Sequence, residues 1–184
     1  MNKTYRFRLY PTKKQQRLLN EWLALCCETY NAALQERRDA YRMAGVSLGF
    51  AHQCAELPAC KAVRPELAQV NAQVLQNVLK RVDLAFQAFF RGRKKGEKIG
   101  FPRYKSRFSY HSLTFPQYGE KGCFSLSGDG KLVLSKLGHV KMVQHRRMQG
   151  TPKTAIVKCS PTGKWFVSIC CAQVGPEVLP PSDA

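Results

Sequence analysis

The sequence is poor in acidic residues, has no long apolar run and contains no Cys-x-x-Cys motif. Its 184 residues include 12 Asp and Glu against 30 Lys and Arg, which gives a formal net charge of +18. No apolar run approaches the roughly 18 residues that a membrane-spanning helix needs. Residues 1–8 alternate charged and aromatic side chains and lack the apolar core of a signal peptide. We therefore expect a soluble, globular, intracellular protein.

The eight cysteines do not have the spacing of a disulfide framework or a zinc motif. None forms a Cys-x-x-Cys pair, and two pairs are adjacent in sequence. Because the cytosol keeps thiols reduced, we interpret most of them as small buried hydrophobic residues. His52, Cys54 and Cys60 offer three metal ligands, but their spacing matches no zinc knuckle.

The few acidic residues predict no catalytic cluster. Two-metal nucleases need carboxylates that converge from ordered strands or helices. Here Asp129 lies in a Gly-Asp-Gly turn, and Glu177 and Asp183 lie in a Pro-rich tail. The four histidines are scattered and include no His-x-His pair. We therefore expect no catalytic residue in this chain.

The surplus of positive charge is the strongest feature that is present. A small globule of charge +18 repels itself unless an anionic partner neutralises it. Nucleic acid is the favoured partner, because each Lys or Arg on a phosphate releases condensed counterions. A basic surface without sequence reading is the alternative. A membrane surface is less favoured, since the charge is not confined to one amphipathic helix.

Hydrophobic periodicity predicts an α+β fold with two long helices. Residues 3–10 alternate as a strand, and the Thr-x-x-Gln spacing at Thr12 is typical of a capping box. The helix that begins there is expected to break at Gly45. A second long helix is expected over 67–91, packed antiparallel to the first. The segment between them is expected to be irregular, with one short helix near 51–56.

After residue 108 the pattern changes to short strands. They are expected at residues 113–115, 123–126, 132–134, 140–143, 154–159 and 165–172. Turn residues lie between the strands at 123–126 and 132–134, and between those at 154–159 and 165–172. Both pairs are therefore predicted to form hairpins. Together with residues 3–10 they make seven strands, which a small β-barrel or curled sheet accommodates while hiding its edges.

Basic residues are concentrated between positions 80 and 107. This stretch holds ten basic and two acidic residues, and Phe101, Tyr104 and the following Phe108 are interleaved with them. Such a pattern suits neutralisation of phosphates combined with stacking on bases. A solvated basic loop is the alternative.

Five runs of sequence occur in an order that is typical of one family. They are YRFRLYPTKKQ at 5–15, ETYNAAL at 28–34, VLQNVLKRVDLAFQAFFRGRKKGEKIGFPRYKSR at 74–107, KLGHVKM at 136–142 and GKWFVSICCAQV at 163–174. Together they resemble the TnpB-type, or OrfB, family of transposon-encoded proteins. The resemblance implies an RNA-guided DNA endonuclease, of a kind once classed with transposases and similar to the compact ancestors of type V CRISPR effectors.

The resemblance also implies a division into domains. Residues 1–10 and 108–174 would form a small, wedge-like β-barrel domain, split by an inserted helical recognition domain with its basic connection at 11–107. Residues 175–184 would be a linker or a frayed C-terminus. The two domains would hold guide RNA from the transposon end and the RNA–DNA heteroduplex. They would also read a short motif in the target double-stranded DNA, in the cytoplasm and at the bacterial nucleoid.

Family members continue into a RuvC-like nuclease domain and a zinc ribbon. This sequence stops at Ala184, where the first strand of that domain is expected. The resemblance therefore implies the nucleic-acid-binding half of a nuclease, with no metal or cofactor of its own. Mg²⁺ and Zn²⁺ are expected only for the missing C-terminal domains. An RNA-independent DNA-binding regulator, or an inactive truncated transposase remnant, is the alternative. A helix-turn-helix of the two long helices is disfavoured, because their connection of roughly 20 residues far exceeds the usual 3–4-residue turn.

Gln76 is the residue most expected to contact a base edge, because an amide pairs bidentately with adenine. Asn71 stands near the place where some relatives have a basic residue, and Phe50 stands where an aromatic hydroxyl occurs. The candidate nucleic-acid-binding residues, which share basic, amide or aromatic side chains, are Arg6, Arg8, Lys13, Lys14, Arg17, Tyr30, Asn31, Phe50, Asn71, Gln76, Asn77, Lys80, Arg81, Arg91, Arg93, Lys94, Lys95, Arg103, Tyr104, Lys105, Arg107, Lys141, Arg146 and Arg147.

Overall fold

The structure, a computed structural model, describes residues 1–173 and residue 175. Apart from Gly175, the linker expected at 175–184 therefore lies outside the described residues. The elements follow in the order β1 Lys3–Tyr10, α1 Lys13–Ala44, α2 Phe50–Val63, the 3-10 helix η1 Pro65–Gln69, α3 Ala72–Lys94, β2 Ser112–Phe115, β3 Phe124–Leu126, β4 Leu132–Leu134, β5 Gly138–Val143, β6 Thr151–Cys159 and β7 Trp165–Ala172. Within the described residues, no helix is long and apolar enough to cross a membrane.

The seven strands form one antiparallel sheet in the order β2-β6-β7-β1-β5-β4-β3. The strand count and the α+β class are confirmed. The sheet curls, but no pairing of β2 with β3 closes it within the described chain. It is a half-barrel, which agrees with the curled sheet among the two expected forms. The reason is that β2 and β3 are only four and three residues long, and both remain edges.

Strand β1 lies in the interior of the sheet although the three helices separate it from all other strands. It pairs with β5 on one side and β7 on the other, and both pairs are antiparallel. Tyr5, Phe7 and Leu9 point into the hollow of the half-barrel and are 1–2% exposed. The alternation read from the sequence is therefore confirmed. Because β1 pairs with β5 and β7, the first residues of the chain share one core with the strands that follow the helices.

Helix α1 begins and ends where its sequence predicts. The Thr12 side chain accepts a hydrogen bond from Gln15 N at 3.3 Å, and Thr12 N donates to Gln15 Oε1 at 3.0 Å. This reciprocal pair satisfies two otherwise free N–H groups of the first turn. At the other end Gly45 adopts φ +67°, a left-handed conformation that residues with a Cβ rarely adopt.

The segment between the long helices is more regular than expected. Helix α2 has 14 residues and continues through Pro58, and η1 follows where the second long helix was expected to begin. Helix α3 begins later, because Asn71 caps it by accepting from Gln73 N at 2.8 Å. Buried Gln53 and Leu57 hold α2 against its neighbours, and such packing outweighs the local preference of proline.

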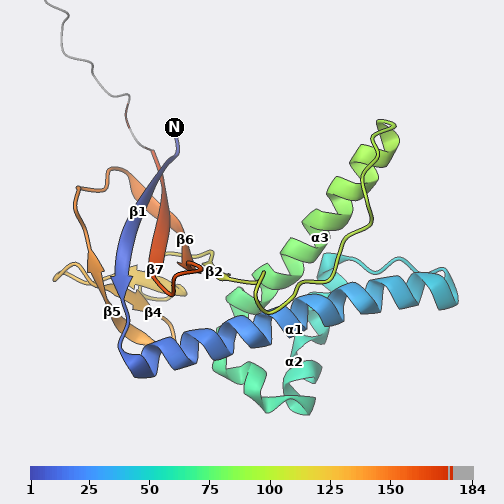
Figure 1. Cartoon of the computed structure of the whole chain (residues 1–184), viewed down its shortest axis with the longest axis horizontal. Helices are drawn as coiled ribbons and strands as arrows, with labels where there is room; N and C mark the ends of the chain where they lie inside the picture. The colour runs from blue at the N-terminus through green and yellow to red at the C-terminus, as the bar shows by residue number, and fades with distance from the viewer. Residues whose placement is uncertain (174, 176–184) are drawn as a thin grey trace, which may run out of the picture.

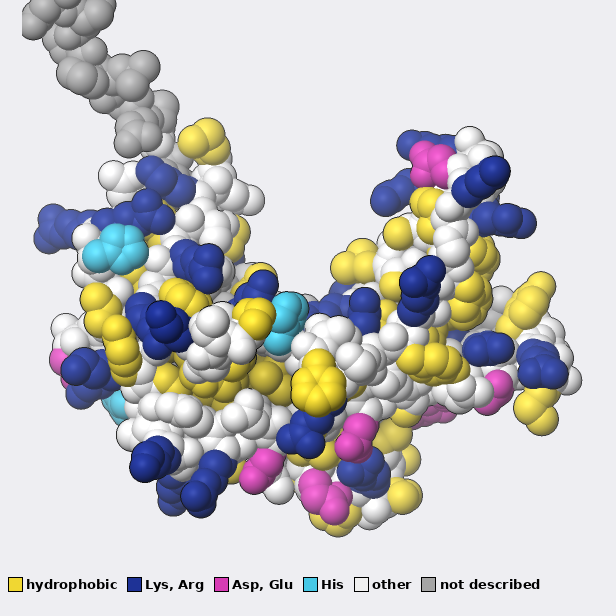
Figure 2. Space-filling model, viewed as in Figure 1, with side chains coloured by type: hydrophobic (Ala, Val, Ile, Leu, Met, Phe, Trp, Pro, Cys, Tyr) yellow, Lys and Arg dark blue, Asp and Glu magenta, His cyan; other side chains and the backbone are white. Residues whose placement is uncertain are grey.

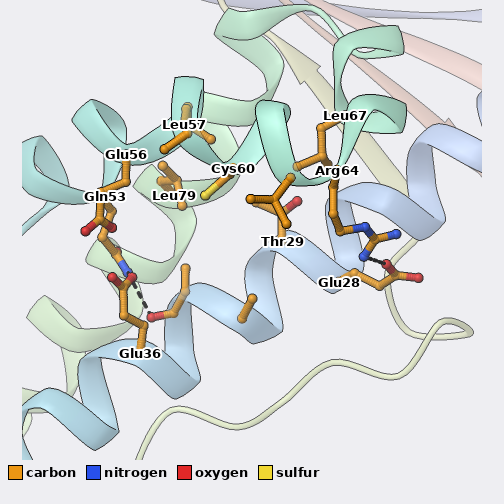
Figure 3. A pocket seen from close by; sticks show the side chains of 14 residues that line it. Glu28, Thr29, Glu36, Gln53, Glu56, Leu57, Cys60, Arg64, Leu67 and Leu79 are labelled. Atoms are coloured by element: carbon orange, nitrogen blue, oxygen red, sulfur yellow. Dashed lines mark hydrogen bonds and ion pairs between the residues drawn. The ribbon is translucent and has the colours of Figure 1, made fainter.

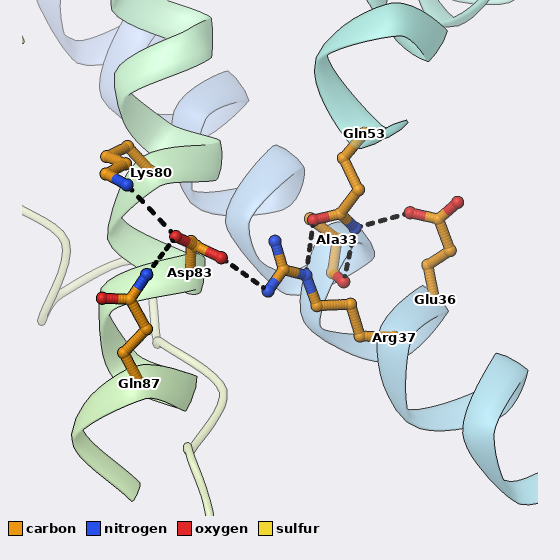
Figure 4. A network of polar contacts seen from close by, with 7 residues as sticks. All are labelled: Ala33, Glu36, Arg37, Gln53, Lys80, Asp83 and Gln87. Carbon is orange, nitrogen blue, oxygen red and sulfur yellow. Dashed lines mark hydrogen bonds and ion pairs between the residues drawn. The ribbon is translucent and has the colours of Figure 1, made fainter. Parts of the chain in front are cut away.

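A buried polar network joins the three helices (Figure 4). Arg37, 7% exposed, donates from Nε to Gln53 Oε1 at 2.8 Å and from Nη1 to Asp83 Oδ1 at 3.2 Å. Gln53 donates in turn to Ala33 O at 2.9 Å and to Glu36 Oε2 at 2.6 Å. The guanidinium therefore has a partner from each of the other two helices, which orients α2 and α3 on α1.

The long helices cross instead of packing antiparallel, so that expectation is wrong. Figure 1 shows α3 rising away from α1 and the connection to β2 returning along it. We call residues 95–109 the return segment. Phe101 of this segment packs edge-on against Phe86 and Phe89, with ring centroids 5.4 and 5.5 Å apart. The far half of α3 thus packs on the return segment, which leaves it free to diverge from α1.

Candidate nucleic-acid interface

A single asparagine holds the middle of the return segment on α1. Asn31 donates from Nδ2 to Lys105 O and accepts at Oδ1 from Lys105 N, both at 2.8 Å. The Cys27 thiol also donates to Lys105 O at 3.3 Å. Because both ends of its amide are used, Asn31 is a scaffold residue in this structure and not a free contact for nucleic acid.

The three interleaved aromatic residues have different surroundings. Phe101 belongs to the phenylalanine cluster of α3, although 44% of it is exposed. The Tyr104 hydroxyl donates to Gln35 on α1. Phe108 is 96% exposed. Phe108 is therefore the ring of the return segment that is open to a base, although the candidate residues did not include it.

The end of α3 and the return segment form a surface of uncompensated positive charge. Figure 2 shows dark-blue Lys and Arg side chains gathered at this end of the molecule. Seven of the candidate residues are exposed here and form no ion pair within the described part of the chain: Arg91, Arg93, Lys94, Lys95, Arg103, Lys105 and Arg107. Phosphates are the natural partners of such a surface.

A second group of basic candidates lies on and beside the sheet. Arg6, Arg8 and Lys141 point outward from β1 and β5, on the face opposite the core. Arg146 lies over the Tyr5 ring at 5.3 Å, next to exposed Arg147. The basic residues of the first turns of α1 are also exposed, and these are Lys13, Lys14 and Arg17.

An open cleft of about 450 Å³ lies between α2, α3 and the end of β2. It brings Phe50 of α2 together with Gln76 and Asn77 of α3, all three of which are candidate residues from the sequence. Lys80 lines it too, with Nζ 5.1 Å from the centre of the Phe50 ring. The fold adds Gln117, which the sequence did not single out.

Gln117 reaches this cleft from the connection after β2 and accepts a hydrogen bond from Gln73 Nε2. No sequence spacing links it to Gln76, because the two residues are 41 positions apart. Gln76 and Gln117 become neighbours only in the folded chain, because β2 pairs antiparallel with β6 and α3 packs against β2. The result is a cleft rich in amide groups, which both donate and accept hydrogen bonds as base edges do.

Three further candidates have partners inside the fold, and their contact with nucleic acid stays a prediction. Tyr30 is 4% exposed, and its ring lies 6.3 Å from that of Tyr110. Arg81 donates from Nη1 to Ser112 O at 3.0 Å and from Nη2 to Thr114 Oγ1 at 2.7 Å. Asn71 donates to Ser135 Oγ at 3.0 Å in addition to capping α3.

An acid-lined apolar hollow of about 550 Å³ lies between α1, α2 and η1. Figure 3 shows Glu36 and Glu56 at one end of it and the Glu28–Arg64 ion pair, at 2.6 Å, at the other. A hydrogen bond with Glu36 raises the pKa of the Glu56 carboxyl. Carboxylates repel phosphates, so this hollow is not part of the nucleic-acid interface.

His52 lies beside Glu36 and Glu56, two of the carboxylates that line this hollow. Ligand atoms of Glu36, His52 and Glu56 lie within 4.8 Å of one another, and His52 Nδ1 is 3.5 Å from Glu56 Oε1. Cys54 and Cys60 are not part of this cluster. Among the described residues, the side chains of His52, Cys54 and Cys60 therefore do not converge on one point, and the metal site that their spacing disfavours has no geometric support.

Comparison with known proteins agrees with the resemblance seen in the sequence. A family model described as the helix-turn-helix domain of OrfB-type proteins matches residues 1–45. A Streptomyces pristinaespiralis protein named "Putative RNA-guided DNA endonuclease" is 28% identical over 176 residues, which cover 93% of this chain and 42% of that protein. The chain thus spans less than half the length of this relative. Both matches support similarity to the N-terminal part of TnpB-type proteins.

The geometry of residues 1–45 differs from the description of the matched family. This region holds β1, one continuous 32-residue helix and its C-terminal cap. A helix-turn-helix needs two helices joined by a tight turn, and these residues contain one helix. The family match therefore carries information about ancestry, and the interface has to be sought on α3, the return segment and the sheet.

Proposed function

We propose that this chain is the nucleic-acid-binding half of a TnpB-type RNA-guided DNA endonuclease and is catalytically silent by itself. It binds guide RNA through its basic surfaces, holds the RNA–DNA heteroduplex and reads a short motif in double-stranded DNA beside the transposon. Its sheet acts as the wedge-like domain, and its helices act as the recognition domain inserted into it. The nuclease activity belongs to a C-terminal portion like that of the longer relative.

One feature of α3 carries this proposal. Near its start, the exposed Gln76 lines the amide-rich cleft together with Asn77 and Gln117. At its far end, the same helix carries the uncompensated charges of Arg91 and Lys94. A rigid helix that presents base-reading groups at one end and phosphate-binding groups at the other suits a protein that holds DNA in a defined register.

The basic surfaces supply affinity and the cleft supplies discrimination. Phosphate contacts are independent of sequence, whereas an amide on a base edge distinguishes one base pair from another. The cleft is small, which is consistent with a protein in which a guide RNA recognises most of the DNA sequence. It would read a few base pairs only, as the proteins of other RNA-guided systems do.

Binding titrations against salt test the proposal directly. The three ligands are a structured RNA from the transposon end, duplex DNA, and the same duplex with that RNA present. We expect tight binding to the RNA and measurable DNA binding only when the RNA is present. Incubation with Mg²⁺ should leave both nucleic acids intact.

The alternative is a DNA-binding regulator that needs no RNA. Tight binding to duplex DNA without RNA would favour it and would contradict the RNA-guided function. Metal-dependent cleavage of either nucleic acid by this chain would contradict the assignment of catalysis to a missing portion.

A further inference from the structure

The side of the sheet that faces away from the core carries no acidic residue on β1, β5, β6 and β7. We call it the outward sheet face. Its members share the alternate positions of β1, β5, β6 and β7 and are Thr4, Arg6, Arg8, Tyr10, His139, Lys141, Val143, Thr154, Ile156, Lys158, Phe166, Ser168, Cys170 and Ala172. Residues between them, such as Phe7, Val157 and Val167, are 0–1% exposed in the core.

Strand register places basic and aromatic residues of this face in two neighbouring rows. In the first row, Arg8 pairs with Phe166 of β7 and with Val143 of β5, and Phe166 pairs with Lys158 of β6. In the next row, at the end of β1, Tyr10 pairs with Lys141 of β5. The two rows together cross four strands, and the Lys and Arg residues are their only charged members.

Two guanidinium groups share the ring of Phe166. The Arg6 group lies 4.2 Å from the ring centroid and the Arg8 group 5.0 Å from it. Arg8 also lies 5.0 Å from the Tyr10 ring and donates from Nη1 to Trp165 O at 3.2 Å. Both cations are thus held on the sheet before any ligand arrives, with most of their N–H groups unused.

An arginine held over an aromatic ring offers two kinds of contact to a nucleic acid. Its N–H edge donates to phosphate oxygens, and its planar group stacks on a base, as the ring does. A duplex can use only the first kind, because its bases are already stacked on one another. An unpaired strand can use both, and four-stranded sheets in RNA-binding proteins stack two or three bases in this manner.

We propose that the outward sheet face binds an unpaired stretch of RNA, with bases stacked on the cluster of Arg6, Arg8 and Phe166 and phosphates on Lys141 and Lys158. The identity of this strand as guide RNA rests on the proposed function. The binding itself rests on the sheet. Charge complementarity favours a polyanion over a protein domain here, because the face has four Lys and Arg side chains and no carboxylate.

The test uses fluorescence anisotropy with a 12-nucleotide oligouridine, a 12-base-pair RNA duplex and the corresponding oligodeoxythymidine, lengths of about the site sizes of sheet-type strand binders. Phe166→Leu keeps the apolar volume and removes the ring, and Phe166→Tyr keeps the ring. Tyr41→Leu is the matched control, since it removes an exposed ring of α1 that belongs to none of the candidate surfaces. Far-UV circular dichroism and urea unfolding of each variant verify that the fold is kept.

We expect Phe166→Leu to weaken oligouridine binding at least about fivefold, which is the lower end of the stacking contribution of one base. Duplex binding and the salt dependence should be unchanged, and Phe166→Tyr should restore binding. Changing Arg6 and Arg8 together to Gln should also lower the slope of log affinity against log salt by about 1.4, as two lost phosphate contacts to a single strand predict. The control is the double variant Lys61→Gln with Lys121→Gln, which also removes two positive charges but from residues outside the outward sheet face. It should leave the slope unchanged.

Several results would overturn the inference. One is equal loss for oligouridine and duplex in Phe166→Leu, which would mean that no base stacks there. Another is loss in Tyr41→Leu alone. A third is self-association of the protein through this face in place of RNA binding. Oligodeoxythymidine bound as tightly as oligouridine would overturn the RNA preference. RNA-dependent binding of duplex DNA tests the proposed function independently. The proposed function and the RNA-binding role of the outward sheet face can therefore fail separately.

Discussion

At the scale of single residues, Gln76 is the side chain on which DNA reading depends most directly. It is exposed, it lines the amide-rich cleft, and no other described group uses its amide. We expect Gln76→Ala to reduce discrimination between DNA motifs by about 1–3 kcal/mol, the value of one bidentate contact. Competition among duplexes with single base-pair changes, in the presence of RNA, measures this effect.

The control is Gln144→Ala, which removes an exposed amide away from the cleft. It should leave discrimination unchanged. If Gln76→Ala weakened all duplexes equally, Gln76 would be a phosphate or packing contact, and the base-edge role would be wrong.

At single residues the sequence does not show which side chains have partners inside the fold. Asn31, Tyr30 and Arg81 have the side chains of an interface, and they lie in sequence runs that resemble nucleic-acid-binding proteins. Their partners inside the fold decide their role, and those partners are distant in sequence: Lys105 is 74 positions from Asn31. No local pattern carries that information, so an amide or a guanidinium that serves the fold looks the same as one that serves a ligand.

At the scale of secondary-structure elements, the far end of α3 offers the clearest electrostatic prediction. Arg91, Arg93, Lys94 and Lys95 are exposed within and after its last turn. Changing all four to Gln should weaken RNA binding and lower the slope of log affinity against log salt by about 3, if each contacts one phosphate of a single strand. An unchanged slope would show that RNA does not contact this end of the helix.

The junction of the three helices predicts a large effect on stability. Arg37→Met removes the buried cation from the carboxylate of Asp83, whose side chain is 14% exposed, and leaves it with Lys80 at 3.2 Å and the Gln87 amide at 2.7 Å. Breaking a buried ion pair costs about 3–5 kcal/mol, and the two partners that remain put the expected cost at the lower end, about 3 kcal/mol. We therefore expect the free energy of unfolding, measured with urea, to fall by about that amount.

The double variant Arg37→Met with Asp83→Leu is the informative control. Replacing both partners by apolar side chains removes the Asp83 carboxylate together with its buried cation. The double variant should therefore recover much of the lost free energy of unfolding. A double variant no more stable than Arg37→Met would contradict this explanation, and would point to Gln53 as the partner that matters.

The success of sequence reasoning differed between elements for a physical reason. Strand alternation, the cap at Thr12 and the break at Gly45 are local signals, and all three are confirmed. The start of α3 was expected too early, because Leu67 and Val70 continue an apolar spacing that η1 also satisfies. Whether seven strands close into a barrel depends on the pairing of the edges, which no local pattern encodes.

At the scale of the whole molecule, the candidate surfaces occupy different parts of one rigid framework. The sheet carries the outward face, α3 and the return segment carry the uncompensated charges, and the cleft lies between helices and sheet (Figures 1 and 2). Strand β1 and Arg81 tie these parts together, the first through β5 and β7 and the second through β2. The spacing between the surfaces is therefore set by the fold before nucleic acid binds.

The central place of β1 means that the polypeptide need not be continuous. A break in the exposed return segment, for example after Lys98, would divide the chain into one piece with β1 and all the helices and another with β2 to β7. The two pieces would still share one sheet, because β1 fills the position between β5 and β7 that its partner piece leaves vacant. Co-expressed as two polypeptides, they should purify as one complex, and removing residues 1–10 from the first piece should abolish their association.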